Sequence, residues 1–304
     1  MAMHTSAGPV ERLVTAEWLH SNLRGVKVLD CSWYLPSMNR DTKSEYADKH
    51  IPGAQFFDID AIKDLTRPEL PHMLPPPEAF GRAMDQFGIA ASDHVVMYDT
   101  AGVGPACRVF WTFHAMGHGR VSVLDGGLPA WVARGYNVES GEPQVALSTE
   151  RYAAHPIDAL VVDYTGVTKV IGQLKASSGA EGAQIVDARP AARFAGTAPE
   201  PRPGLSSGHM PRAISVPFTE MTEAASPEAP QVQTLKTPAA IRSVFERAGV
   251  DLGRPIIASC GSGVTASVLY FALLNAGVDQ KNLAVYDGSW SEYALNPYSE
   301  IVKN

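Results

Sequence analysis

The sequence predicts an α/β protein made of two tandem domains, each a mostly parallel sheet flanked by helices on both faces. Two observations predict this fold: an internal repeat, and a regular alternation of short β-rich runs with apolar helical patterns in both halves. The length of 304 residues agrees with it, because such a chain suits two domains of ~150 residues each.

Four segments of the first half recur in the second half, in the same order. They pair "GVKVLDCSW" (25–33) with "GAQIVDARP" (182–190), "DKHIPGAQFFD" (48–58) with "SGHMPRAISVPF" (207–218), "DHVVMYDTAGVG" (93–104) with "RPIIASCGSGVT" (254–265), and "RVSVLDGGLPAW" (120–131) with "NLAVYDGSWSEY" (282–293). Their spacing is similar too: Asp30 and Asp99 lie 69 positions apart, and Asp187 and Cys260 lie 73 apart. We therefore interpret the chain as a tandem duplication.

The elements follow from composition and periodicity. The segments 105–117 and 264–277 are strongly apolar and end at glycine, which predicts a well-buried helix in each half. The stretch from residue 140 to about residue 156 is rich in Ser, Pro and Glu without a clear period, which is typical of a linker. We predict an N-terminal domain over 10–140, a linker over 141–160 and a catalytic C-terminal domain over 161–304.

Charge and composition exclude several classes of function. The formal net charge of −7 argues against nucleic-acid or anionic-membrane partners, which need a basic surface. No run reaches the ~18 continuous apolar residues of a spanning helix, and "MAMHTSAGPV" resembles neither a signal peptide nor a transit peptide. We therefore expect a cytoplasmic protein. Three scattered cysteines and nine dispersed histidines predict no disulfide framework and no metal site.

Cys260 is the candidate nucleophile. The repeat sets it opposite Asp99, at the carboxyl end of equivalent strands, where open α/β sheets place their sites. Gly261 and Gly263 allow a sharp turn that gathers backbone N–H groups into an anion-binding nest. The five residues after the cysteine would form this cradle: Gly261, Ser262, Gly263, Val264 and Thr265.

The start of a helix near Val264 or Thr265 adds the positive end of its dipole, which favours a thiolate or persulfide at Cys260. The structural alternative is a buried cysteine beside a tight turn, which we do expect for Cys31 and Cys107. A Cys-loop phosphatase needs an arginine six residues after its cysteine to bind the phosphate dianion. That position holds Ala266, which argues against phosphatase activity.

Taken together, the tandem halves and the motifs "DAR" (187–189), "GHMP" (208–211), "CGSGVT" (260–265) and "YDGSW" (286–290) resemble the two-domain rhodanese-like sulfurtransferases. Within that family, the loop is similar to that of the members specific for 3-mercaptopyruvate. Members that prefer thiosulfate have an arginine and a lysine after the cysteine, where this chain has Gly261 and Ser262. The resemblance covers residues 10–297 and implies two rhodanese-like domains.

The resemblance also assigns substrate-binding residues. In "RFAGTAPEPRPG" (193–204), Arg193 and Arg202 match the family's arginines for the carboxylate and keto oxygen of 3-mercaptopyruvate. A planar guanidinium suits a carboxylate because it donates two parallel hydrogen bonds. We expect Arg189 to have a structural role instead.

The first half should contribute a proton relay. The segment "FFDIDAIKDLTRPELPHML" (56–74) resembles the family segment whose aspartate and histidine face the serine of the cysteine loop, which gives Asp60, His72 and Ser262. The segment is one residue longer here, so Asp58 and Asp64 are substitutes for Asp60.

The resemblance implies a reaction in which Cys260 takes sulfur from 3-mercaptopyruvate as a persulfide, releases pyruvate and passes the sulfur to a thiol or cyanide. The family implies small thiols and thioredoxin as acceptors, and no metal or organic cofactor. One alternative is a thiosulfate:cyanide sulfurtransferase. Another is a non-catalytic sulfur carrier or interaction module, against which stand the intact cysteine loop and both arginines.

Overall fold

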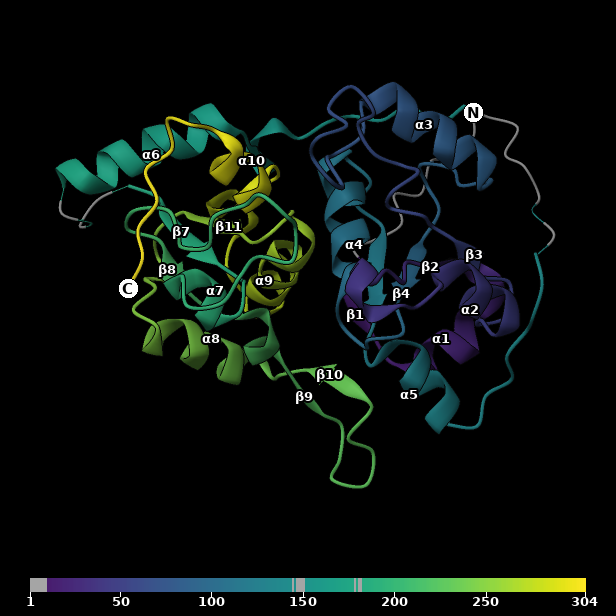
Figure 1. The fold of residues 1–304 in the computed structure, drawn as a ribbon. Coiled ribbons are helices and arrows are strands. Elements are labelled where there is room, and N and C mark those ends of the chain that lie inside the picture. Colours follow the sequence, from purple (N-terminus) through teal and green to yellow (C-terminus); the bar gives the residue numbers. More distant parts are fainter. Residues whose placement is uncertain (1–9, 144, 146–150, 178, 180–181) are drawn as a thin grey trace.

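The structure is a computed structural model that describes residues 10–143, 145, 151–177, 179 and 182–304. Figure 1 shows two lobes, one from each half of the chain. The first lobe contains β1 (Leu13–Val14), α1 (Ala16–Asn22), η1 (Leu23–Gly25), β2 (Lys27–Asp30), η2 (Pro36–Met38), α2 (Thr42–Asp48), β3 (Gln55–Phe56), α3 (Pro77–Gln86), β4 (Val95–Tyr98), α4 (Pro105–Ala115), β5 (Val121–Leu124) and α5 (Gly127–Ala133).

The second lobe repeats this plan with an additional hairpin. Its elements are η3 (Asp158–Leu160), β6 (Val161–Val162), α6 (Tyr164–Ala176), β7 (Gln184–Asp187), α7 (Ala191–Ala195), β8 (Ile214–Ser215), η4 (Phe218–Met221), β9 (Thr222–Ala224), β10 (Gln233–Leu235), α8 (Pro238–Arg247), β11 (Ile256–Ser259), α9 (Val264–Asn275), η5 (Gln280–Asn282), β12 (Leu283–Tyr286) and α10 (Ser289–Leu295).

Both sheets have five strands in equivalent order. The first runs β1-β5-β4-β2-β3 and the second β6-β12-β11-β7-β8, and every pairing within them is parallel. Asp30 pairs with Tyr98 in the first sheet, as Asp187 pairs with Ser259 in the second. The predicted α/β fold and the duplication are therefore confirmed, and β4 and β11 are the equivalent central strands that lead to Asp99 and Cys260.

The two lobes meet through the two helices that the sequence predicts to be buried. α4 packs against α9, with the rings of Phe110 and Phe271 edge to face at 4.9 Å between centroids. One hydrophobic cluster includes core residues of both lobes. Because apolar burial of this kind holds the lobes together, a site between them can draw residues from both.

The β9–β10 hairpin has no counterpart in the first half and was not predicted. It is antiparallel and extends from the second lobe towards the first (Figure 1). There the backbone N–H of Leu235 donates to the Asp125 carboxylate at 2.8 Å, and the carbonyl of Gln233 fills the space beside Gly102. The hairpin therefore covers the loop of the first lobe that corresponds to the cysteine loop.

The described part of the predicted linker packs on the first lobe. The Tyr152 ring contacts Phe80 at 5.6 Å between centroids, and its hydroxyl lies 2.8 Å from His118 Nδ1. We propose 10–140, 141–160 and 161–304 as the division of the chain, with Tyr152 of the linker packed on the first lobe. Among the described residues, no helix is both long and apolar enough to cross a membrane.

Candidate active site

Cys260 follows the last residue of β11, as the sequence predicts. It is 2 % exposed, and its Sγ accepts a hydrogen bond from the backbone N–H of Ser262 at 3.4 Å. α9 begins at Val264, directly after Gly263, whose φ of 81° lies in the left-handed region that favours glycine. The strand end, the turn and the helix N-terminus thus converge on the sulfur, an arrangement that stabilises a sulfur anion.

The segment from β12 to α10 forms the wall behind this loop. The Cys260 N–H donates to Ser289 Oγ at 3.2 Å, and the Trp290 N–H donates to the Cys260 carbonyl at 2.9 Å. The Gly261 carbonyl accepts from the N–H of Ser291 at 2.9 Å and from its hydroxyl at 2.6 Å. The carbonyls of Cys260 and Gly261 are therefore bound by α10, which fixes the backbone of the loop beside the sulfur.

The equivalent loop of the first lobe is an anion nest already filled by a carboxylate. Asp99 accepts hydrogen bonds from four backbone N–H groups at 2.8–2.9 Å; their donors are Ala101, Gly102, Gly104 and Ala106. Burial raises the pKa of Asp99, and these four bonds oppose that rise. The duplicated loop is thus built to hold one negative group, and the second lobe holds a cysteine at that position.

Both predicted substrate arginines face the cysteine loop. A Cβ added to Gly261 would lie 3.1 Å from Arg193 Nη2 and 3.8 Å from Arg202 Nη1. Arg193 is held by Glu200, to which its Nε donates at 3.1 Å. A glycine at 261 therefore keeps the space between the loop and the two guanidinium groups free for a small anion.

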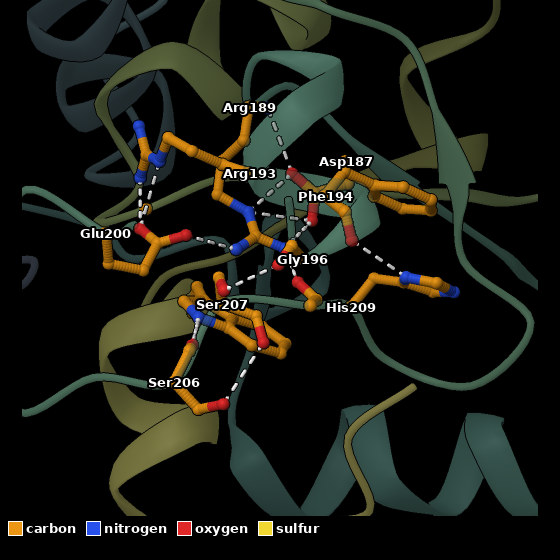
Figure 2. A network of polar contacts seen from close by, with 12 residues as sticks. Asp187, Arg189, Arg193, Phe194, Gly196, Glu200, Ser206, Ser207 and His209 are labelled. Carbon is orange, nitrogen blue, oxygen red and sulfur yellow. Dashed lines mark hydrogen bonds and ion pairs between the residues drawn. The ribbon is translucent and has the colours of Figure 1, made fainter. Parts of the chain in front are cut away.

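Glu200 also connects this site to Arg189 (Figure 2). Arg189 Nη1 lies 2.8 Å from Glu200 Oε1, and its Nη2 lies 2.7 Å from Asp187 Oδ2 at the end of β7. The guanidinium also lies over the Trp290 ring, 4.1 Å from its centroid. Arg189 is fully buried in these contacts, which agrees with the structural role predicted for it.

The structure brings the expected relay residues together from both lobes. His72 Nδ1 lies 2.9 Å from Asp60 Oδ1, and Arg202 Nη2 lies 3.5 Å from His72 Nε2 and 3.3 Å from Ser262 Oγ. Arg202 therefore stands between the imidazole and the serine.

The two substitutes for Asp60, which are Asp58 and Asp64, contact other residues than His72. Asp58 accepts from the Asp60 N–H at 2.9 Å and pairs with Lys43 at 3.0 Å. Asp64 accepts from the Thr66 N–H at 2.8 Å. Asp60 is thus the carboxylate that contacts His72.

Burial and one hydrogen bond determine the protonation states of His72 and Asp60. Burial lowers the pKa of His72, while Asp60 opposes that change. The hydrogen bond with His72 lowers the pKa of Asp60 to about 2. At neutral pH the carboxylate is therefore ionised and lies beside Nδ1 of a neutral imidazole, whose Nε2 is on the side of Arg202.

Comparison with known proteins agrees with this geometry. The family model for the rhodanese-like domain matches residues 15–134 and again 170–296. The chain is 40% identical over 307 residues to the mitochondrial thiosulfate/3-mercaptopyruvate sulfurtransferase 1 of Arabidopsis thaliana, covering 96% of this chain and 78% of that protein. It is 38% identical over 298 residues to human 3-mercaptopyruvate sulfurtransferase, covering 95% and 94%.

The chain belongs to the tandem rhodanese-like sulfurtransferases. A solved structure supports the same assignment: the crystal structure of SseA from Escherichia coli superposes with a TM-score of 0.79 at 36% identity, covering 92% of this chain and 99% of that one. The predicted family resemblance is confirmed.

Sequence reasoning missed several residues that build the site of this sulfurtransferase. Glu200, which holds Arg193, stands between the two predicted arginines in the run 193–204, so its position was a usable signal. Arg108 was missed although it is the only charge in the segment 105–113, and a charge in a buried helix needs a partner. Ser289 and Ser291 gave no signal, because serine is common in turns.

The pH dependence of this sulfurtransferase should follow the His72–Asp60 pair. Asp60 favours the protonated imidazole, so Asp60→Asn should lower the pKa of His72 further. Because the proton relay that we expect needs neutral His72, the acid limb of the kcat profile should move to lower pH, while kcat falls through loss of orientation. Steady-state pyruvate release between pH 4.5 and 8 would measure both. Asp64→Asn is the matched control; a limb that moves in that variant, or stays fixed in Asp60→Asn, contradicts the assignment.

Proposed function

We propose that this sulfurtransferase moves the sulfur of 3-mercaptopyruvate onto Cys260 as a persulfide, releases pyruvate, and passes the sulfur to a thiol or to cyanide. The observation that carries the proposal is the meeting of three groups: a cysteine in an anion-binding loop, two arginines facing that loop, and a histidine beside one of them. A thiol nucleophile, an anchor for an α-keto acid and a proton acceptor are what this transfer needs.

In the first step, the thiolate of Cys260 attacks the sulfur of the donor. The S–S bond forms as the C–S bond breaks, and the bonding electron pair stays on the carbon as the enolate of pyruvate. Arg193 and Arg202 bind the carboxylate and keto oxygen, so the charge that develops on the keto oxygen meets a fixed guanidinium. The enolate then takes a proton at carbon and leaves as pyruvate.

Ser262, His72 and Asp60 supply and remove protons in this scheme. The Nε2 atom of neutral His72 accepts the thiol proton of the donor and returns it to the enolate, and the Ser262 hydroxyl, which lies on the other side of Arg202, exchanges its proton with the donor sulfur. Such general acid–base catalysis contributes about 10²–10⁴-fold. The outer sulfur of the persulfide is held by N–H groups of the residues after Cys260: Gly261, Ser262, Gly263, Val264 and Thr265.

In the second step, an acceptor thiolate attacks the outer sulfur, and Cys260 leaves as a thiolate. Small thiols and thioredoxin are the acceptors we expect. A reducing compartment suits this chemistry, because Cys31, Cys107 and Cys260 are all free thiols, and we expect that compartment to be the cytoplasm. Among the described residues, no three His, Cys, Asp or Glu side chains are placed to hold a metal ion.

Thiosulfate is the second candidate donor, because the name of the Arabidopsis relative includes both donors. Gly261 and Ser262 bring no charge to the loop itself, and we expect the two arginines near it to bind a carboxylate and a keto oxygen. We expect a kcat/KM for 3-mercaptopyruvate at least ~10-fold above that for thiosulfate, equivalent to about 1.4 kcal/mol.

The test measures pyruvate release from 3-mercaptopyruvate and thiocyanate formation from thiosulfate and cyanide, with the same purified protein. A higher kcat/KM with thiosulfate would make the chain a thiosulfate:cyanide sulfurtransferase. A single stoichiometric persulfide without turnover in either assay would make it a sulfur carrier.

A further inference from the structure

Arg108 is a charged residue of the first lobe that lies against the active site of the second. It extends from α4, the helix that packs on α9, and it is 2 % exposed. Its Nη2 lies 2.7 Å from Asp287 Oδ1 and also donates to the backbone carbonyl of His72. One guanidinium therefore joins the segment that carries the histidine to the turn that follows β12.

Asp287 completes this connection. Its Oδ2 accepts a hydrogen bond from the Leu74 N–H at 2.7 Å, so the backbone is held on both sides of residue 73. Like Arg108, Asp287 is almost fully buried. A buried ion pair repays the cost of its desolvation only with good geometry and additional hydrogen bonds, and the additional bonds that Arg108 and Asp287 make here converge on residues 72–74.

His72 needs such support because of its backbone. Its φ of 58° lies in the left-handed region, which a residue with a side chain adopts only where its surroundings impose it. The same backbone directs the imidazole to Asp60 and Arg202. The bonds at the His72 carbonyl and at the Leu74 N–H hold the backbone on either side of residue 73, in addition to the bond within the segment from the Asp64 N–H to the Met73 carbonyl at 3.0 Å.

Arg108 also contacts the cysteine loop. A Cβ on Gly263 would lie 2.5 Å from Arg108 Nη1 and 3.0 Å from the Asp287 carbonyl. The Nη1 atom is buried and has no hydrogen-bond partner. Gly263 is thus required both by its own φ and by the guanidinium beside it, and this close contact ties the position of the loop to that of the histidine segment.

We propose that Arg108 is a positioning residue for this reaction: with Asp287 it holds His72 in its left-handed conformation and in register with the cysteine loop across the lobe interface. The inference rests on the proposed function. It gives the first lobe, which lacks a nucleophile, a positioning role in the reaction. Because Arg108 is almost fully buried, we expect it not to contact the donor, so its loss should change kcat and leave substrate binding by Arg193 and Arg202 largely intact.

The test compares Arg108→Met, Arg108→Lys and the double variant Arg108→Met/Asp287→Asn with wild type. Because a misplaced relay loses roughly 10–100-fold in rate, we expect kcat for pyruvate release to fall by about that factor in all three, with KM within about threefold. Lysine keeps the charge but cannot join Asp287 and the His72 carbonyl with one planar fork. The double variant leaves no buried charge unpaired, so it should fold even if Arg108→Met does not.

Arg67→Met is the matched control, because Arg67 also forms an ion pair across the lobes, 2.7 Å from Glu292, without contacting His72 or the loop. Its kcat should stay within about twofold of wild type. Wild-type kcat in the double variant or in Arg108→Lys, or an equal loss in Arg67→Met, would overturn the proposal.

Crystal structures of the Arg108 variants test the inference without any turnover. In Arg108→Met and in the double variant, His72 should leave the left-handed region, whereas a φ that stays near its present value would overturn the positioning role. A wild-type protein without activity towards 3-mercaptopyruvate would instead contradict the proposed function, so the two failures are distinguishable.

Discussion

Cys260→Ser should abolish sulfur transfer from either donor. A serine hydroxyl is not ionised at neutral pH, and it cannot form the S–S bond that the reaction needs. We expect pyruvate release to fall by a factor of at least ~10³, to the level of the uncatalysed reaction. Pyruvate formation at a rate near that of wild type would remove Cys260 from the mechanism.

The other two cysteines are the internal control. Burial raises the pKa of Cys31 and of Cys107 well above its ordinary value, so both thiols stay protonated and inert at neutral pH. Cys107→Ala should therefore keep kcat within about twofold of wild type. Mass spectrometry after donor treatment should show an adduct of about 32 Da, one sulfur atom, in wild type and in Cys107→Ala, but not in Cys260→Ser.

The fold could be predicted because the duplication repeats the same order of strands and helices in both halves of the chain. Strand ends at Asp30 and Asp187, and at Asp99 and Cys260, occupy equivalent positions in both sheets. The β9–β10 hairpin was missed for the same reason: it occurs once, so no second copy pointed to it. Its short strands also lie within a polar stretch, 222–235, where alternation of apolar residues is weak.

Only part of the candidate site could be predicted from the local sequence. Cys260 could be found from its own loop, because strand, glycine turn and helix follow one another in the sequence. His72 and Asp60 come from the other lobe, and only the family resemblance linked them to the cysteine. The contacts of Arg108 could not be predicted. The local sequence places Arg108 in an apolar helix, but its partners His72 and Asp287 lie 36 and 179 positions away. No local sequence pattern encodes contacts between residues so far apart in the chain.

The two substrate arginines should differ in how their loss affects the kinetics. Arg193 is bonded to Glu200 and contacts the loop beside Gly261, so it is held in place mainly to bind the donor. Arg202 contacts His72 and Ser262 as well, so it also touches the relay. We expect Arg193→Met to raise KM for 3-mercaptopyruvate, and Arg202→Met to raise KM and lower kcat.

Each loss should be about 1.5–3 kcal/mol in transition-state stabilisation, the range of a hydrogen bond to a charged group, or roughly 10–150-fold in kcat/KM. The measurement is steady-state pyruvate release for both variants, with Arg24→Met as a control that removes an exposed positive charge far from the site. Arg202→Lys should recover only part of the loss, since lysine lacks the planar fork.

Thiosulfate provides the test of specificity for these arginines. It has neither a carboxylate nor a keto oxygen, so both variants should lose less kcat/KM with thiosulfate than with 3-mercaptopyruvate. Equal losses with the two donors would mean that the arginines attract any anion to the loop. In that case the carboxylate and the keto group would not determine donor choice, and the preference for 3-mercaptopyruvate would have to come from the uncharged Gly261 and Ser262 alone.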